Sequence, residues 1–365
     1  MKSRKALLRE AARIPNEGGM TMKMTIKEVA KEAGVSISTV SRVLNGRDRV
    51  SRHTINRVRA VIEKLQFQPD FVARTMIMKK TSTIGLIVPQ LSNEYWALMS
   101  EVIQDALWMR GYTTLICSTD NEPDKDEAYL KMCLERRMDG VIYCSSPYCG
   151  PEARDGLDAI KEAGVPLVSL DPNIAGVSCV VGDHLQGTLT AVEHLIRAGY
   201  ARIAYIGGPA VSIEREFGYR KALMMHGYRV DEGLIRLVKG QSFADGHEGL
   251  RALRSSGLAF DALFCGNDLL AFGAIKAMEE AGIRVPEDVA VVGYDDIFSA
   301  RLFKPALTTV RQPIPDIGEE LVQLLLASLE TEPERRTVRK IVLPTELIVR
   351  ESSGAALRQG AEARR

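Results

Sequence analysis

The sequence lacks the features that define several large protein classes. Its 365 residues contain no apolar run near the roughly 18 residues of a membrane-spanning helix. Residues 1–23 lack the continuous apolar segment of a signal peptide. The six cysteines form no CxxC pair and no Cys/His spacing typical of a metal site, and most have apolar neighbours. We therefore expect buried free thiols in a reducing, cytoplasmic protein, with no metal.

The motifs of common catalytic sites are absent as well. The sequence contains no GxGxxG, GxxxxGK[ST], GxSxG or HExxH, and His184 and His194 lie ten residues apart, which gives no ligand pair. Asp295 and Asp296, in GYDD, are candidates for an acid and a base. They also follow a predicted strand, where open α/β sheets bind ligands without chemistry. Ligand binding is therefore favoured over catalysis, and no cofactor is expected.

The net charge of +1 hides an asymmetry between the two ends of the chain. Residues 1–80 contain 18 Lys and Arg against 7 Asp and Glu, a net charge of +11. Because the whole chain carries +1, residues 81–365 carry −10. Basic N-termini often only increase solubility, but a basic head on an acidic body favours a polyanionic partner for the head alone.

Three short helical patterns make up residues 25–65. The first begins at Thr25, with Glu28 three residues later as in a capping box, and ends at Gly34. The second follows Ser36 and the third follows Ser51, and each has an apolar stripe at helical spacing. Two helices flanking a short Gly-Val-Ser turn, with a third packed on them, are typical of a helix-turn-helix domain that reads the major groove of DNA.

The second helix presents side chains suited to base edges. Ile37 suits contact with a thymine methyl, Ser38 is a short hydrogen-bonding group, and Arg42 suits a bidentate contact with guanine. Three neighbouring polar residues suit contacts with DNA phosphates: Thr39, Ser41 and Asn45. An exposed helical face without function is the alternative. The three-helix pattern and the basic charge favour DNA binding.

From residue 83 onward, strands alternate with amphipathic helices. Seven short runs rich in β-branched residues predict strands, at 84–89, 113–118, 139–144, 165–170, 202–207, 262–266 and 289–294. Strand–helix alternation with short loops indicates parallel sheets covered on both faces. About ten strands are more than one such sheet usually holds. We therefore expect two doubly wound lobes, with a break near Gly182.

Several motifs resemble the LacI/GalR family of bacterial transcriptional regulators. TIKEVAKEAGVS, STVSRVLNG, VGYDD and PALTTVRQP occur in the family's order and spacing, and the resemblance covers residues 25–352. It implies an α/β fold class: an N-terminal all-α helix-turn-helix domain, a hinge helix, and a two-lobed, doubly wound core like a periplasmic sugar-binding protein. It also implies a repressor that binds near-palindromic double-stranded DNA as a homodimer and responds to a small effector between the lobes.

With this resemblance, the expected domains divide the chain as follows. Residues 1–23 form a disordered extension, 24–67 the helix-turn-helix domain and 68–81 a hinge or linker. The N-terminal lobe takes 82–182 plus 312–342, the C-terminal lobe takes 183–311 plus 343–352, and 353–365 is a tail. The tail has no Leu heptad, which predicts a dimer rather than a tetramer.

The resemblance also assigns site residues. Ile37, Ser38 and Arg42 match base-reading positions, and Met76 stands where the family usually has a Leu that wedges into the minor groove. Seven residues match effector-binding positions, of which Phe243 is the loosest match: Tyr95, Trp96, Asp171, Arg215, Phe243, Asn267 and Asp295.

The chemistry of this set suits a sugar, because carboxylates, an amide and a guanidinium hold hydroxyls while aromatic rings pack on apolar sugar faces. Three alternatives stay open. Asp171 and Asp295 can each serve only as caps for the segments that follow them. The effector can be a purine or nucleoside. The protein can be a ligand sensor without a role on DNA. A DNA-binding regulator implies a nucleoid-associated location.

Overall fold

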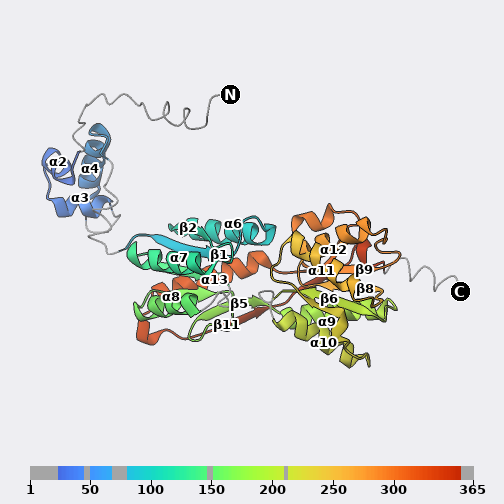
Figure 1. Ribbon diagram of the computed structural model, residues 1–365. Coiled ribbons are helices and arrows are strands. Elements are labelled where there is room, and N and C mark those ends of the chain that lie inside the picture. Colours follow the sequence, from blue (N-terminus) through green and yellow to red (C-terminus); the bar gives the residue numbers. More distant parts are fainter. Residues whose placement is uncertain (1–23, 45–49, 68–79, 146–150, 209–212, 355–365) are drawn as a thin grey trace, which may run out of the picture. The chain divides into compact units, whose positions relative to one another are not determined.

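The computed structural model describes residues 24–44, 50–67, 80–145, 151–208 and 213–354, and it divides into two compact units, 1–80 and 81–365. Figure 1 traces the elements of each unit. Three predicted site or hinge features lie outside the described residues: Asn45, Met76 and nearly all of 68–81.

The first unit contains three described helices, α2 (Ile26–Glu32), α3 (Ile37–Leu44) and α4 (Arg52–Lys64). As predicted, Glu28 accepts a hydrogen bond from the backbone N–H of Thr25 at 2.6 Å. Gly34 ends the first helix with a φ of +62°, a left-handed conformation that a residue with a Cβ adopts only at a cost. The predicted apolar stripes, together with Phe67, form a separate small core.

The second unit contains two six-stranded sheets with the same strand order, and Figure 1 shows them as two neighbouring lobes. The first sheet has the order β11-β5-β4-β3-β1-β2. Its strands are β1 (Thr83–Val88), β2 (Thr113–Ser118), β3 (Gly140–Tyr143), β4 (Leu167–Ser169), β5 (Ser178–Gly182) and β11 (Lys340–Leu343). The helices that accompany it are α6 (Glu94–Trp108), α7 (Pro123–Glu135), α8 (Pro151–Glu162) and α13 (Ile314–Leu329).

The second sheet has the order β12-β10-β9-β8-β6-β7. Its strands are β6 (Ile203–Gly207), β7 (Ile235–Leu237), β8 (Ala262–Cys265), β9 (Ala290–Asp295), β10 (Thr308–Arg311) and β12 (Glu346–Ile348). Its helices are α9 (His184–Arg197), α10 (Ile213–Met225), α11 (Phe243–Ser255) and α12 (Asp268–Glu280). Short 3-10 turns η2 (Glu232–Leu234), η3 (Phe298–Arg301), η4 (Pro333–Arg335) and η5 (Glu351–Ser353) complete the described elements.

The seven strands predicted from the sequence are all present, and the prediction of two doubly wound lobes is confirmed. One feature differs from an all-parallel arrangement. The last strand, β12, runs antiparallel to β10 at the edge of the second sheet. A chain that leaves the first sheet after β11 reaches this edge within a few residues, which permits an antiparallel edge strand but not a crossover helix.

The chain crosses between the two sheets three times. The first crossing follows Gly182, at the end of β5, and the second follows Arg311, at the end of β10. The third lies between β11 and β12. Because all three crossings follow the carboxyl ends of parallel strands, these ends face the region between the sheets, where open α/β folds bind ligands.

Candidate functional site

The exposed face of α3 holds the predicted base-reading side chains. Ile37 is 45% exposed, and Ser38 and Arg42 are also exposed. Thr39 and Ser41 are half-buried. The apolar residues of the same helix point into the small core, so α3 has one face for packing and one face for a partner.

Thr39 and Ser38 are held by one serine. The Ser36 hydroxyl lies 2.8 Å from the hydroxyls of both Ser38 and Thr39, and it also accepts from the Thr39 backbone N–H at 3.2 Å. This arrangement caps the start of α3. It fixes the position of the helix end that carries the polar side chains.

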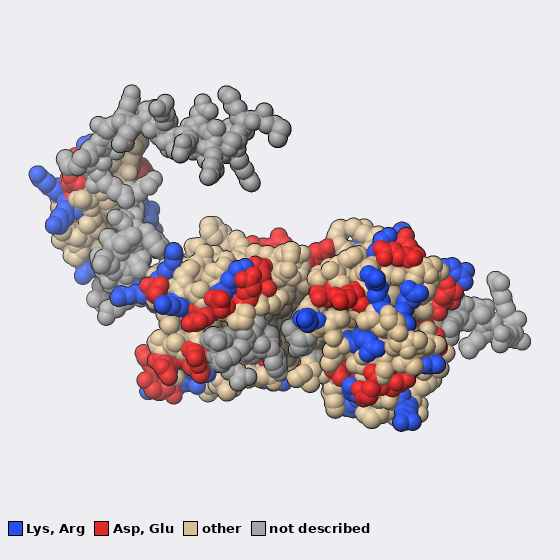
Figure 2. Space-filling model, viewed as in Figure 1, with Lys and Arg blue, Asp and Glu red and all other residues tan. Residues whose placement is uncertain are grey.

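The described helices of the first unit present an excess of basic groups, and Figure 2 shows several of them on its visible face. The exposed ones are Lys27, Lys31, Arg42, Arg52, Arg57, Arg59 and Lys64. On the visible face of the second unit, both signs of charge are interspersed (Figure 2). The positive charge is therefore concentrated on the unit whose helix presents hydrogen-bonding side chains, which is the distribution expected of a DNA-binding head.

The second unit contains a cavity of about 270 Å³ between the carboxyl ends of its two sets of strands. Loops after β1, β3 and β4 line one side, and the start of α10 with the ends of β9 and β10 lines the other. Its wall contains both polar groups and two aromatic rings. Five of the seven predicted effector-binding residues line it: Tyr95, Trp96, Asp171, Arg215 and Asp295.

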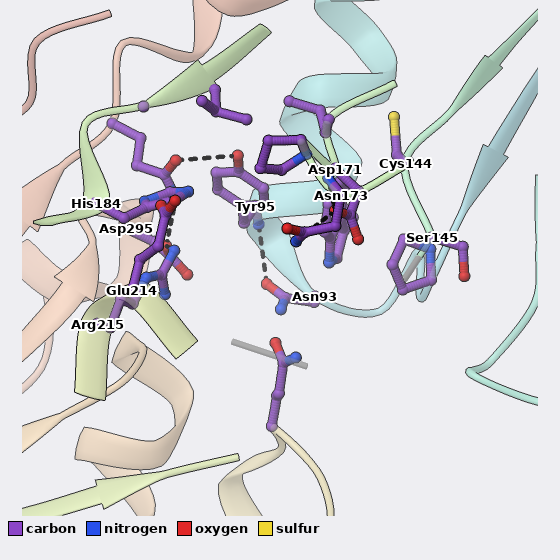
Figure 3. A pocket seen from close by; sticks show the side chains of 18 of the residues that line it. Asn93, Tyr95, Cys144, Ser145, Asp171, Asn173, His184, Glu214, Arg215 and Asp295 are labelled. Carbon is purple, nitrogen blue, oxygen red and sulfur yellow. Dashed lines mark hydrogen bonds and ion pairs between the residues drawn. The ribbon is translucent and has the colours of Figure 1, made fainter. Parts of the chain in front are cut away.

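Arg215 and Asp295 form the charged centre of this cavity (Figure 3). An Arg215 guanidinium nitrogen lies 3.4 Å from a carboxylate oxygen of Asp295, and both residues are only 6% exposed. The guanidinium also donates to the backbone carbonyl of Gly266 and lies 3.8 Å from the centre of the Tyr294 ring. A buried arginine with these partners is fixed in place before any ligand arrives.

Asp295 is linked to the opposite lobe through Gln312. The Gln312 amide donates to Asp295 at 2.7 Å, and Tyr95, on α6, donates its hydroxyl to Gln312 at 3.3 Å. Burial raises the pKa of Asp295 to about 6, although Arg215 and the Gln312 hydrogen bond act in the opposite direction. The carboxylate is therefore mainly ionised at neutral pH and available to accept hydroxyl hydrogens.

His184 lines the cavity as a neutral side chain. Burial, and then the nearby Arg215, lower its pKa well below the ordinary value. Its Nδ1 lies 3.1 Å from the hydroxyl of Tyr294. The sequence gives this histidine no ligand partner, and the structure places it as a hydrogen-bonding group on the wall rather than as a charged one.

Asp296 does not share the environment of Asp295. Its two carboxylate oxygens pair with Arg311 at 2.7 Å and Arg350 at 2.6 Å, and its side chain is 2% exposed. These ion pairs join the end of β9 to β10 and to the segment after β12. The GYDD pair is therefore one cavity residue and one structural residue, and not an acid beside a base.

Two predicted effector-binding residues are not on the cavity wall. Phe243 is the first residue of α11 and is 42% exposed. Asn267 caps α12 through Leu270 N–H and donates to the backbone carbonyl of Gln241 at 3.0 Å. Because Gln241 lines the cavity, Asn267 contributes to the site indirectly, by holding the backbone of the loop that contains Gln241.

Several polar residues of the wall were not predicted from the sequence. They include Asn93, Asn121, Ser145, Asn173, His184, Glu214, Gln241 and Gln312. One signal was available, because Gln312 directly follows the segment TTVR and most of the others also stand just after a strand. Polar residues at carboxyl ends of strands are candidates for ligand contacts in any such fold.

Comparison with known proteins settles the family. Residues 25–70 match the model for bacterial regulatory proteins of the lacI family, and residues 192–353 match a periplasmic-binding-protein-like domain. The chain is 35% identical to the HTH-type transcriptional regulator DegA of Bacillus subtilis over 91% of its own length and 98% of that protein. This chain belongs to the LacI family of bacterial regulatory proteins. It is a DNA-binding transcription regulator controlled by an effector, and its relatives are regulators rather than enzymes.

Solved structures agree with this membership. A lac repressor dimer bound to operator and the anti-inducer ONPF superimposes with a TM-score of 0.78 at 26% identity, covering 90% of this chain and 99% of that one. A complex of the transcriptional regulator CelR with cellobiose gives a TM-score of 0.67 at 32% identity, with the same coverage. Among sequence relatives, the HTH-type transcriptional repressor PurR of Haemophilus influenzae is 34% identical over 90% of this chain and 98% of that protein.

Cysteines and candidate metal ligands give no second site. The five cysteines in the described ranges are free and buried, as predicted for all six. Within the same ranges, no three side chains from His, Cys, Asp and Glu gather where a metal ion would bind. In the part of the chain that the structure covers, no helix has both the length and the apolar character to span a membrane.

Proposed function

We propose that this regulator is a repressor that binds a near-palindromic operator as a homodimer and responds to a sugar or sugar derivative in the core cavity. The observation that carries the sugar assignment is the combination of two aromatic rings, Tyr95 and Trp96, with the buried Arg215–Asp295 pair in one cavity. Aromatic faces pack on the C–H faces of a sugar, and fixed charged groups hold its hydroxyls.

A purine or nucleoside is the second candidate effector. It is supported by the same aromatic and charged side chains. Similarity to the CelR–cellobiose complex and to a ribose operon repressor of Halalkalibacterium halodurans, 32% identical over 90% of this chain, supports the sugar.

On DNA, we assign base contacts to Ile37, Ser38 and Arg42. Phosphate contacts are assigned to Thr39, Ser41 and Asn45, and Met76 is assigned to the minor groove at the centre of the operator. The exposure of the first three and the basic charge around them support the assignment. Two recognition helices in a dimer suit half-sites about one helical turn apart.

The control mechanism follows from the two sheets. We propose that residues 82–182 with about 312–342, and residues 183–311 with about 343–352, move as two lobes that rotate when the effector binds. Rotation changes the distance between the segments 68–81 of the two protomers. Since a short isolated helix is marginal in water, this segment forms a helix only when its partner and DNA are both in place. An effector with a preference of a few kcal/mol for one arrangement changes operator occupancy.

A thermal-shift screen of sugars and purines tests the effector assignment, because a cavity ligand raises the melting temperature of the folded state. We expect a shift with members of the sugar panel. A shift with purines alone would overturn the sugar assignment in favour of the second candidate.

A gel shift at two salt concentrations tests the DNA function. We expect binding to genomic operator fragments that weakens with salt, and none from a variant lacking residues 1–80 that still binds the effector. Repeating the gel shift with effector gives the direction of control. Failure of the full chain to select any fragment would contradict the operator assignment.

A further inference from the structure

The cavity has an unequal balance of charged groups. Three carboxylates lie on its wall, those of Asp171, Glu214 and Asp295. Arg215 is the only Lys or Arg among the wall residues that the structure describes, and His184 is neutral. The two undescribed segments adjoining wall residues in the sequence, 146–150 and 209–212, read SPYCG and PAVS and contain no charged residue.

The single guanidinium is already held by groups of the protein. Arg215 donates to the Gly266 carbonyl, pairs with Asp295 and stacks on the Tyr294 ring, and it is 6% exposed. A carboxylate or phosphate of a ligand would have to compete with Asp295 for it. The same ligand would enter a space whose remaining charges are negative, which is a repulsive arrangement.

Glu214 differs from the other two acids on the wall. Asp171 accepts hydrogen bonds from the backbone and side-chain amides of Asn173 at 2.7 and 2.9 Å, and Asp295 pairs with Arg215. The Glu214 carboxylate forms no hydrogen bond or ion pair with any residue in the described ranges. It lies beside Arg215 at the start of α10, on the side of the cavity opposite Asp171 (Figure 3).

The neighbouring acid on the same helix gives a contrast. Glu216 also belongs to the first turn of α10, where a negative charge is favourable for the helix dipole. It pairs with Arg220 at 2.7 Å and is not part of the cavity wall. Glu216 can therefore supply the negative charge that stabilises this helix end. A role for Glu214 is to be sought in the cavity that it lines.

We propose that Glu214 sets the charge selectivity of the effector cavity by receiving a protonated amine of a hydroxylated effector, such as an amino sugar. The proposal rests on the sugar assignment above and narrows it. An ammonium group offers three donors to a carboxylate that has no partner among the residues the structure describes. Effectors that carry a carboxylate or phosphate are excluded by the same charges.

The test compares matched ligands on the full-length protein by calorimetry near neutral pH. The ligands are the gluco and galacto forms of the hexose, the hexosamine, the N-acetylhexosamine, the hexuronate and the hexose 6-phosphate. We expect one hexosamine to bind about tenfold or more tightly than its hexose, as a charge-assisted hydrogen bond predicts. The N-acetyl form, which has lost the charge, loses this gain, and the two anionic forms bind weakest.

Two variants assign the effect to one side chain. Glu214→Gln should bring the affinity for the hexosamine to that of the same variant for the hexose. Glu216→Gln, which removes the same charge from the same helix turn, should retain the wild-type order. A thermal melt of each variant checks that it is folded.

Each other outcome has a defined meaning. Equal binding of hexose and hexosamine, tight binding of an anionic form, or an amine preference that survives Glu214→Gln would overturn this inference and leave the sugar assignment standing. Binding of purines with no sugar bound would overturn both.

Discussion

Glu94 in one lobe and Ser299 in the other are joined by a pair of hydrogen bonds, in addition to the three chain crossings that connect the lobes. Glu94 is the first residue of α6, and Ser299 lies in η3 after the last residues of β9. One carboxylate oxygen accepts from the Ser299 backbone N–H at 3.0 Å, and the other accepts from its hydroxyl. The adjoining residues Asn93 and Tyr95 line the cavity, so this contact lies beside the ligand site.

Replacing Glu94 by Ala should therefore weaken the arrangement of lobes seen here. Hydrogen bonds to a charged group contribute about 1.5–3 kcal/mol when well sheltered, and this pair is only half-buried. We expect the free energy of unfolding, measured in urea, to fall by about 1–2 kcal/mol. Glu101→Ala, at an exposed position of the same helix, is the control and should change it by less than about 0.5 kcal/mol. An equal loss in both variants would assign the effect to the helix and not to the contact.

Replacing each of the two adjacent aspartates of GYDD by Asn should have a different effect. Asp296→Asn should mainly lower stability, and Asp295→Asn should mainly affect ligand binding. Asp296→Asn leaves the largely buried Arg350 without its carboxylate, whereas the half-exposed Arg311 keeps Glu346 at 3.4 Å. We expect a loss of about 3 kcal/mol in unfolding free energy. Asp296 has a φ of +53°, which Asn tolerates, so the backbone is not the cause.

Asp295→Asn should instead affect ligand binding more than stability, because Arg215 keeps the Gly266 carbonyl and the Tyr294 ring. Denaturant unfolding and calorimetry on both variants separate the two effects. Greater destabilisation by Asp295→Asn than by Asp296→Asn would show that the roles are reversed.

Asp126 should make stability fall as pH rises. This residue of α7 is fully buried. The Tyr143 hydroxyl donates to its Oδ2 at 2.5 Å, while its Oδ1 has no hydrogen-bond partner among the described residues. Burial raises the pKa of Asp126 from 3.8 to about 6. A folded pKa above the unfolded pKa means that the folded state holds the proton more tightly. The resulting stability is complete below about pH 4 and is lost as pH rises through about 6.

Asp126→Asn removes this titration and keeps an acceptor for Tyr143. Between pH 4 and pH 7, the unfolding free energy of the variant should rise relative to that of the wild type by about 2–3 kcal/mol. The size of this change follows from the pKa shift of about two units. Urea titrations at several pH values measure it. A difference that is constant with pH would refute the assignment to Asp126.

Arg42→Ala should relax base preference more than it weakens DNA binding overall. A bidentate arginine contact discriminates between bases by about 1–3 kcal/mol. Selection from a randomised operator pool measures the preference, and fluorescence anisotropy on the selected and a scrambled site measures the ratio of affinities. Arg57→Ala, exposed on α4, is the matched control and should leave the preference unchanged. A preference that survives in Arg42→Ala would remove this residue from the base-reading set.

The sequence predicted the regular parts of this protein because their burial follows a simple periodicity. Two of the strands that were not predicted, β10 and β11, have a weaker pattern. In β11 half-buried and exposed residues alternate at the edge of a sheet, so little apolar surface marks it. In β10, Thr308 and Thr309 are fully buried because their hydroxyls bond Ser353 and Asp268, respectively, and a search for apolar runs does not detect such a strand.

The cavity was predictable only in part for a related reason. Tyr95, Arg215 and Asp295 come from motifs that resemble a known family, and they meet in the structure. His184 and Gln312 meet them only because the chain crosses between the lobes beside both residues. Spacing along the sequence carries no sign of such a meeting, whereas a rule for polar residues after strands would have found Gln312.

The three crossings also govern when the first lobe is completed during synthesis. Its edge strand β11 and its helix α13 come from residues 314–343, which are synthesised much later than the strands that they cover. A ribosome that has released only residues 1–182 has therefore delivered a sheet with one bare edge and one face that α6 covers only in part. The N-terminal three-helix unit, which has its own core, is complete long before then. A nascent chain thus carries a finished DNA-reading head well before the lobes that regulate it exist.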